Sequence, residues 1–326
     1  MSCITDAHEA RDIYTRYAEI GVPIARIGSS TYMNNEALIR AASEFATERG
    51  IKRMAISLFF TANYPNMSQL RRMTTCRSPE FGFHVATAMV RALVGSRYSP
   101  YRNVDVILHL DHGQADADKS FLYDLVDEFA TINFDAGIYP FQENIRRTKE
   151  YMQFVKGRAL VEGAVEEVSV AGVWDTKQKL TTPAQAVEFM ERTGVDFVVP
   201  NVGTESQRET TESLKYARRL VQDIYKALGR KAMVIHGVSC LSLDELATLS
   251  DDGAAGVNIW TRFARAAGEH ARRALAEYQV PPTEKDPNRR FDPMDIAYSR
   301  AWIEKFVSEV KEFLANLGYG RLAGKV

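Results

Sequence analysis

Two histidines and an aspartate come directly after an apolar run, in the segment 106–113, Val-Ile-Leu-His-Leu-Asp-His-Gly. Neutral imidazoles bind divalent metals, so His109 and His112 are candidate ligands, and Asp111 between them is a candidate for proton transfer. Parallel α/β enzymes carry their chemistry at the C-terminal ends of buried strands. We therefore expect a catalytic site at the end of this strand.

Two later segments have the same character. In the segment 236–239, His-Gly-Val-Ser, the glycine lets backbone approach a ligand and Ser239 can begin a helix whose N–H groups bind an anion. The segment 258–262, Asn-Ile-Trp-Thr-Arg, offers a second helix start, to which Arg262 would add a planar cation. The alternative for Arg262 is a solvated helix residue.

These segments belong to an alternation of apolar β-type runs and helical stretches. The runs are continuous rather than alternating, as expected for parallel strands covered on both faces. The predicted strands are 23–28, 51–59, 104–110, 132–135, 159–165, 196–200, 232–236 and 256–259. The predicted helices include 34–49, 114–129, 142–156, 183–192, 209–228 and 243–249.

Eight strands alternating with helices predict an α/β fold, a (β/α)8 TIM barrel. An open doubly wound sheet is the alternative, but no glycine-rich phosphate fingerprint follows any strand. We expect a single domain over 1–326, with the barrel at about 20–280 and a C-terminal helical arm at 281–326. The long connection 60–79 is predicted to be a lid or an interface arm.

Polar residues gather just past the predicted strand ends, as a barrel with its site on that face requires. Three of the six histidines are among them, and the other three, His8, His84 and His270, lie in predicted helical stretches. The strand-end residues are Ser29, Ser30, His109, Asp111, His112, Asp135, Glu162, Asn201, Thr204, Glu205, His236, Ser239, Asn258 and Thr261.

Composition excludes several classes of protein. The chain has 326 residues and a net charge of -1, which argues against nucleic acid or an anionic membrane as the main partner. No apolar run approaches the roughly 20 residues that cross a bilayer, and the N-terminus lacks the features of a secretory signal. Three scattered cysteines predict reduced thiols in a cytoplasmic protein.

Taken in order along most of the chain, these segments resemble class II, metal-dependent fructose-bisphosphate and tagatose-bisphosphate aldolases. Residues 109–113 resemble the H-x-D-H signature, and 236–239 resemble H-G-G-S. The other matching segments are 135–145, 161–162, 193–196 with 203–204, 258–261, 291–293 and 323–325.

The resemblance implies a TIM barrel, a catalytic Zn²⁺, a homodimer or homotetramer, and a small phosphorylated or otherwise anionic substrate. The implied chemistry is reversible aldol cleavage of a ketose phosphate, in which the metal polarises the ketone and stabilises an enediolate. His112 and His236 would be metal ligands, and Asp111, together with His109 in the same signature, would be catalytic. The residues expected around the substrate and its phosphate are Gly203, Thr204, Gly237, Ser239, Asn258, Thr261, Arg262 and Asp135.

The chain departs from the family pattern at sensitive positions. Ser206 stands where the family has its third metal histidine. A catalytic zinc site normally has three protein ligands, so Glu205 or Glu162 would have to complete this one. A site of two histidines and one carboxylate would also suit iron or manganese. Trp260 replaces an aspartate and fills space left to the substrate, which predicts a substrate other than fructose 1,6-bisphosphate.

Two other hypotheses remain open from sequence. The same barrel could catalyse a different and metal-independent reaction, with Cys240 either reactive or simply buried. The chain could also be a binding protein that has lost the metal and its catalysis.

Overall fold

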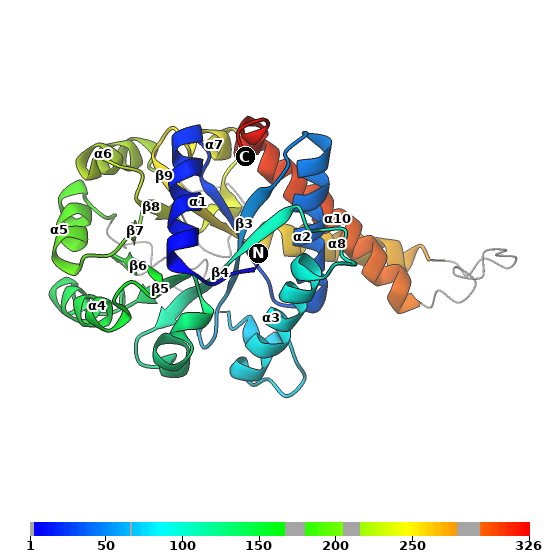
Figure 1. Cartoon of the computed structure of the whole chain (residues 1–326), viewed down its shortest axis with the longest axis horizontal. Helices are drawn as coiled ribbons and strands as arrows, with labels where there is room; N and C mark the ends of the chain where they lie inside the picture. Colours follow the sequence, from blue (N-terminus) through cyan, green and yellow to red (C-terminus); the bar gives the residue numbers. More distant parts are fainter. Residues whose placement is uncertain (1–2, 66, 167–179, 205–215, 279–293) are drawn as a thin grey trace, which may run out of the picture.

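The protein is a closed parallel β-barrel surrounded by helices (Figure 1). The computed structural model describes residues 3–65, 67–166, 180–204, 216–278 and 294–326. Each barrel strand pairs in parallel with the next, and the last pairs with the first, which confirms the predicted TIM barrel. The barrel strands are β2 (Ile24–Gly28), β3 (Met54–Phe60), β4 (Val104–Gln114), β5 (Thr131–Asp135), β6 (Leu160–Ala164), β7 (Phe197–Val199), β8 (Met233–Ile235) and β9 (Ala254–Ile259). The short β1 (Cys3–Ile4) lies beside the first half of β4.

Helices form the outer layer, and local capping residues determine where several of them begin. The side chains of Asp6, Thr31, Ser78, Thr182 and Ser242 each accept a hydrogen bond from a backbone N–H in the first turn of the helix that follows. The helices are α1 (Ala7–Ile20), α2 (Tyr32–Glu48), α3 (Pro79–Gly95), α4 (Phe141–Val155), α5 (Pro183–Thr193), α6 (Arg218–Leu228), α7 (Leu243–Thr248), α8 (Thr261–Ala276) and α10 (Met294–Asn316). The C-terminal helix α10 packs against α8 and α2 (Figure 1).

The predicted helix over 114–129 is wrong. Strand β4 continues to Gln114 and is followed only by two short turns, Ser120–Asp124 and Val126–Glu128. The buried carboxylate of Asp118 accepts hydrogen bonds from the backbone N–H of Gln114 and from Asn63. These bonds offer the backbone an alternative to the helical ladder. Of the predicted helix over 209–228, residues 218–228 form α6, and 209–215 lie outside the described residues.

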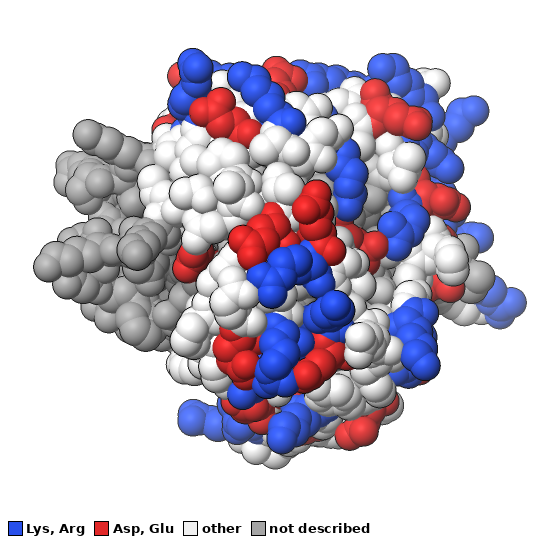
Figure 2. Space-filling view, turned by 90° about the vertical axis from the view of Figure 1, so that its left-hand side faces the viewer, with Lys and Arg blue, Asp and Glu red and all other residues white. Residues whose placement is uncertain are grey.

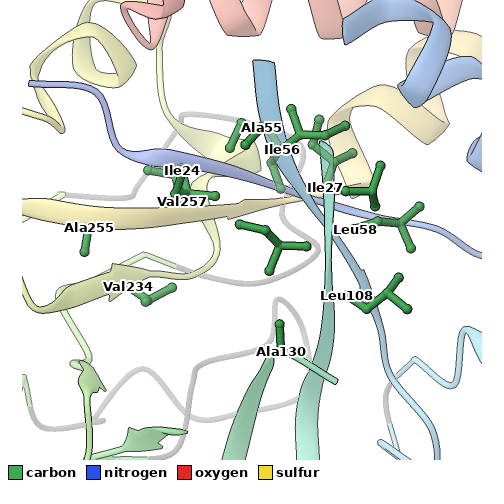
Figure 3. Close-up of a cluster of buried hydrophobic side chains, with 14 of the residues drawn as sticks. Ile24, Ile27, Ala55, Ile56, Leu58, Leu108, Ala130, Val234, Ala255 and Val257 are labelled. Carbon is green, nitrogen blue, oxygen red and sulfur yellow. The ribbon is translucent and has the colours of Figure 1, made fainter. Parts of the chain in front are cut away.

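The barrel strands are buried along nearly their whole length, which explains their continuous apolar sequences. Ile24 and Ile27 of β2 pack beside side chains of β3, β4 and β9, including Ile56, Leu108 and Val257 (Figure 3). Every residue of β2, β3 and β9 is buried. This packed scaffold fixes the polar residues at the strand ends.

The outer surface carries charges of both signs in close alternation. On the face shown in Figure 2, neither sign forms a continuous patch. Pairs within helices contribute to this pattern, as Arg146 does with Glu143 and Glu150 in α4. Within the described ranges, no helix is both long and apolar enough to span a bilayer.

Candidate active site

The end of β4 is irregular, and the irregularity presents two of the predicted residues to a pocket. The register of β4 against β5 shifts between Leu110 and Gly113, so Asp111 and His112 lie in a bulge, a feature that re-aims side chains. His112 has a φ of 48°, in the left-handed region that costs a non-glycine residue energy. A Cβ at Gly113 would lie 2.9 Å from the carbonyl oxygen of Asn133, so only glycine fits at this position of the bulge without a shift of the backbone.

The pocket lies at the C-terminal ends of the barrel strands and opens to solvent, and the free space within it, counted together with its open mouth, is about 480 Å³. The connection after β3, predicted as a lid or interface arm, contributes Tyr64, Met67 and Gln69 to its wall. The other lining residues are Phe59, Thr61, Asp111, His112, His236, Gly237, Ser239, Asn258, Ile259, Trp260 and Thr261. Many of the residues that the sequence places at strand ends therefore line this pocket.

Asp111, His112 and His236 meet in this pocket, and we call them the pocket cluster. Nε2 of His112 lies 3.4 Å from Nδ1 of His236. Nδ1 of His112 hydrogen-bonds the carboxylate of Asp135 at 2.7 Å, and the ring stacks on Tyr64 with centroids 4.3 Å apart. Nε2 of His236 is buried and has no hydrogen-bond partner within the described residues.

The electrostatics of the pocket cluster give its members different charge states. Burial disfavours the imidazolium of His112, but the charges of Asp111 and Asp135 outweigh it and raise the pKa of His112 to about 9. Burial dominates at His236 and lowers its pKa to about 4. Burial also opposes ionisation of Asp111, yet the neighbouring His112 and His236 lower its pKa to about 2. At neutral pH, Asp111 is therefore a carboxylate able to accept a proton.

Asp111 on β4 is oriented by a residue of β9, and the strands β3 and β2 lie between the two. The side-chain amide of Asn258, on β9, donates a hydrogen bond of 2.8 Å to its Oδ1. The same oxygen lies 3.9 Å from Nε2 of His236 and 3.6 Å from Nε2 of His109. Asp111 thus stands between the pocket and a second polar group beneath it.

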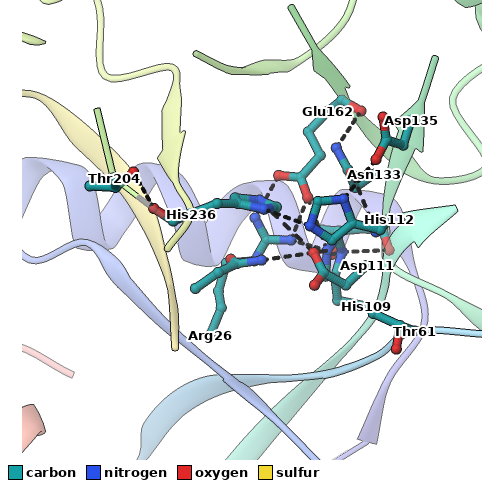
Figure 4. Close-up of polar contacts among 12 residues, drawn as sticks. Arg26, Thr61, His109, Asp111, His112, Asn133, Asp135, Glu162, Thr204 and His236 are labelled. Carbon is teal, nitrogen blue, oxygen red and sulfur yellow. Dashed lines mark hydrogen bonds and ion pairs between the residues drawn. The ribbon is translucent and has the colours of Figure 1, made fainter. Parts of the chain in front are cut away.

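This second group consists of Arg26, His109 and Glu162, and we call it the buried cluster. Arg26 donates to both carboxylate oxygens of Glu162, at 2.5 and 2.7 Å, and its guanidinium also contacts Nε2 of His109 (Figure 4). Nδ1 of His109 lies 2.8 Å from the hydroxyl of Thr131. The buried cluster does not line the pocket. Burial opposes ionisation of Glu162, but Arg26 and His109 hold its pKa well below its usual range.

Sequence reasoning missed Arg26. The available signal was a lone arginine in the otherwise apolar run 23–28, because a buried arginine requires an acidic partner. The partner, Glu162, is 136 positions away, and only closure of the barrel brings the two together. Tyr64 was also missed, since nothing in the sequence of the long connection indicates which residue reaches His112.

The predicted substrate-binding residues divide into three groups. Ser239, Gly237, Asn258 and Thr261 line the pocket, and the hydroxyl of Thr204 donates to the carbonyl oxygen of His236. The guanidinium of Arg262 instead donates to the carbonyl oxygen of Leu241, and Asp135 lies behind His112. The backbone N–H of Gly203 donates to the side chain of Asn201. Glu205, a predicted metal ligand, lies outside the described residues.

The segment after His236 differs from the prediction at Ser239 and bears on the two interpretations of Cys240. Ser239 does not begin the next helix, because Val238–Cys240 forms a separate 3-10 turn and Ser242 caps α7. Cys240 is buried, and its thiol donates to the carbonyl oxygen of Gly237. It does not line the pocket, which favours the structural interpretation of this cysteine.

The pocket cluster fits a divalent metal. Its ligand atoms all lie within 4.8 Å of one another, and two imidazoles with one carboxylate form a common ligand set. The bond from His112 to Asp135 fixes the imidazole and leaves Nε2 toward the pocket, as is usual for metal-binding histidines. Nε2 of His236, buried and without a hydrogen-bond partner among the described residues, is a second observation that agrees with a ligand at this place.

Comparison with known proteins connects this geometry with a family. The family described as fructose-bisphosphate aldolase class-II matches residues 13–319. This chain belongs to the class II fructose-bisphosphate aldolase family. It is thus an enzyme of the aldehyde-lyase group, and the divalent-metal dependence general to class II aldolases agrees with the pocket cluster.

Individual relatives are distant. A probable fructose-bisphosphate aldolase of Bacillus subtilis (strain 168) is 25% identical over 71% of this chain and 78% of the relative. The Escherichia coli (strain K12) protein YdjI is 31% identical over 50% of this chain and 59% of YdjI. The crystal structure of the YdjI aldolase superposes with a TM-score of 0.69 at 20% identity, covering 100% of this chain and 99% of that one. The aldolase fold is retained while most of the sequence has changed.

Proposed function

We propose that this aldolase catalyses reversible aldol cleavage of a ketose phosphate, or a related anionic keto compound, other than fructose 1,6-bisphosphate. The observation that carries the proposal is the pocket cluster: two imidazoles and a carboxylate converge in one pocket, and a buried nitrogen of His236 has no partner among the described residues. The names of the relatives, which are aldolases, support the reaction class.

The residues of the pocket have separable roles in this proposal. In the cleavage direction, Asp111 accepts the proton of the hydroxyl on the carbon whose bond is broken, and it returns this proton in condensation. Asn258 holds Asp111 in place through a hydrogen bond of 2.8 Å. His112 and His236 would hold the metal, which when bound supplies a Lewis acid that polarises the substrate carbonyl.

The anionic end of the substrate has suitable donors on two neighbouring strands. Gly237 and Ser239 follow β8, and Thr261 is the first residue of α8. Backbone N–H groups at a helix start attract anions, and the two hydroxyls add donors. We assign phosphate binding to this side of the pocket.

Trp260 argues against fructose 1,6-bisphosphate. Its ring lines the pocket, and its indole N–H is buried without a partner in the described part of the chain. The position therefore offers a hydrogen-bond donor and a large apolar surface. A substrate with an oxygen acceptor beside an apolar segment satisfies both features.

The metal at the pocket cluster is not fixed by the two histidines alone. We propose zinc, with iron or manganese as alternatives that the same ligand set accepts. Glu205 is a proposed additional ligand. Glu162 fits less well, since Arg26 engages both of its oxygens. We also propose a cytoplasmic setting, with which three free cysteines agree, and a homo-oligomer, as the resemblance to class II aldolases implies.

Elemental analysis of protein purified without a metal-chelating tag tests the proposal first. We expect about one equivalent of divalent metal, as for catalytic metal sites, and its loss in His112→Ala and in His236→Ala. His84→Ala is the matched control, because His84 is exposed on α3. A panel of ketose phosphates and keto acid phosphates, assayed for aldehyde release, then identifies the substrate. A chain without metal that cleaves no member of the panel contradicts the proposal.

A further inference from the structure

Two residues of the buried cluster, His109 and Glu162, form together with Asp111 a group with the composition of a second metal site. The ligand atoms of His109, Asp111 and Glu162 lie within 4.8 Å of one another, as closely as those of the pocket cluster. All three residues are buried. By residue type and spacing alone, the barrel therefore offers two adjacent places for a cation, which share Asp111.

Arg26 distinguishes the two places. It extends from β2 into the barrel with 1% of its surface exposed and binds Glu162 through two N–H groups, at 2.5 and 2.7 Å. Its guanidinium also contacts Nε2 of His109. The lone pairs that a metal would use on Glu162 and His109 are thus already directed at a positive charge.

We propose that the guanidinium of Arg26 is a built-in cation in the place of a second metal ion, so that this barrel binds metal at the pocket cluster alone. The inference rests on the proposed metal-dependent function and extends it, because it assigns the neighbouring site to a side chain. It also removes Glu162 from the candidate metal ligands.

The barrel is adapted to this arginine at a second position. A Cβ added to Gly256 on β9 would lie 2.9 Å from Cδ of Arg26, so the absence of a side chain there makes room for the arginine stem. On the same strand, β9, Asn258 is the residue paired with Arg26 of β2. Asn258 also donates the hydrogen bond that orients Asp111. The cation and the catalytic carboxylate are therefore positioned by the same pair of strands.

Stability alone does not explain the pair. A buried ion pair is often no better for stability than well-packed apolar residues of the same volume, and Nε of Arg26 has no partner within the described residues. A fixed cation does provide what a second metal would, namely neutralisation of Glu162 next to Asp111. It does so without a requirement for a second ion.

Metal stoichiometry in Arg26 variants tests the inference. Wild type, Arg26→Met, Arg26→Lys and the double variant Arg26→Met with Glu162→Gln are dialysed against Mn²⁺ and analysed for bound metal. Arg26→Met is expected to bind one more equivalent than wild type, because the ligands of the buried cluster become available. The double variant is expected to lose that extra equivalent with the carboxylate, and Arg26→Lys is expected to keep the wild-type value. Arg53→Met, which removes an arginine from a half-exposed pair with Asp105, is the control.

A folded Arg26→Met protein with the wild-type stoichiometry overturns the inference. Loss of one partner of a buried pair costs about 3–5 kcal/mol, so this variant could fail to fold. Electron paramagnetic resonance of Mn²⁺ bound to wild type then decides. The spectrum of isolated ions is expected, and a spin-coupled pair within one chain overturns the inference. If wild type binds no metal but Arg26→Met binds one equivalent, the proposed metal-dependent function fails, while the assignment of Arg26 to the place of a metal ion stands.

Discussion

The pocket cluster and the buried cluster contain the same types of metal-binding residue, but these residues have different partners. Both combine histidine with carboxylate, both include residues of β4, and both are almost fully buried. In the buried cluster, Arg26 neutralises Glu162 through two hydrogen bonds, and its Nε, unpartnered in the described part of the chain, lies away from the pocket. In the pocket cluster, the nitrogen of His236 without a partner among the described residues belongs to a residue that lines the pocket. Burial therefore does not identify the reactive group here. An unsatisfied atom beside a pocket does.

The largest effect that separates the two clusters is expected at Asp111. Asp111→Asn keeps the shape of the side chain but removes its ability to accept a proton. We expect aldol turnover to fall by roughly 10²–10⁴-fold, the usual contribution of a general acid–base group. The thermal unfolding midpoint should also fall, because the buried carboxylate of Asp111 interacts with His112 and His236. Steady-state kinetics on the substrate found by the panel measures the loss of turnover.

Asp105→Asn is the matched control for Asp111→Asn, because it neutralises an aspartate at the other end of β4. That residue pairs with Arg53 and lies outside the pocket. A loss of less than tenfold in Asp111→Asn would assign the proton transfer to another residue.

The second prediction concerns pH, and it applies only to the pocket cluster. With its pKa raised to about 9, His112 is protonated at neutral pH and must release a proton to bind metal. We therefore expect metal affinity to rise about tenfold per pH unit between pH 6.5 and 9. In the metal-free protein, the raised pKa of His112 stabilises the folded state at pH values below the pKa that His112 has in the unfolded chain. This stabilisation is lost as the pH rises through about 9.

Competition with a chromophoric chelator at several pH values measures the slope of this affinity. Asp135→Asn is the informative variant, because the bond to Asp135 is among the causes that raise the pKa of His112. We expect the slope in this variant to flatten above neutral pH. A wild-type affinity that is independent of pH over the same range would mean that His112 is not a ligand.

Sequence predicted the pocket cluster because strand ends in a parallel barrel converge on one face. The strand-end residues include Asp111, His112 and His236, and the resemblance to class II aldolases selects these three among them. The order of residues is enough to predict the barrel, since eight apolar runs leave few other topologies. The buried cluster could not be predicted in the same way. The contact between Arg26 and Glu162 crosses the barrel interior, and its geometry depends on the tilt of strands distant in sequence.

Local competition explains the other differences between sequence and structure. The stretch 114–129 is predicted to be a helix, but in the structure the side chain of Asp118 accepts the backbone N–H of Gln114, the first residue of that stretch. The apolar run before His109 gives no sign of the bulge in β4, in which His112 has a left-handed backbone conformation. This bulge directs His112 into the pocket. Arg262 follows a helix start as predicted, but its guanidinium binds a carbonyl oxygen away from the pocket.

The third prediction tests whether the unsatisfied atoms of the pocket serve the substrate. Trp260→Phe retains an aromatic ring but removes the unpartnered N–H donor. Loss of one hydrogen bond to a neutral acceptor costs about 1 kcal/mol, so KM should rise five- to tenfold with a smaller change in kcat. The folded state should not be destabilised, because no protein hydrogen bond is lost among the described residues. An unchanged KM would show that the indole only fills space. Trp302→Phe, a change on α10 outside the pocket, is the control.

The smallest expected effect is at Tyr64, which supports the pocket cluster from the long connection after β3. Its ring lies parallel to that of His112, with an interplanar angle of 9° and centroids 4.3 Å apart. Such contacts contribute about 0.5–1.5 kcal/mol, so Tyr64→Leu should weaken metal binding by about three- to tenfold. Tyr64→Phe keeps the stacked ring and should bind metal like wild type, which separates the ring contact from the hydroxyl. If both variants bind metal equally well, the bulge of β4 alone is sufficient to hold His112, and the connection serves the substrate rather than the metal.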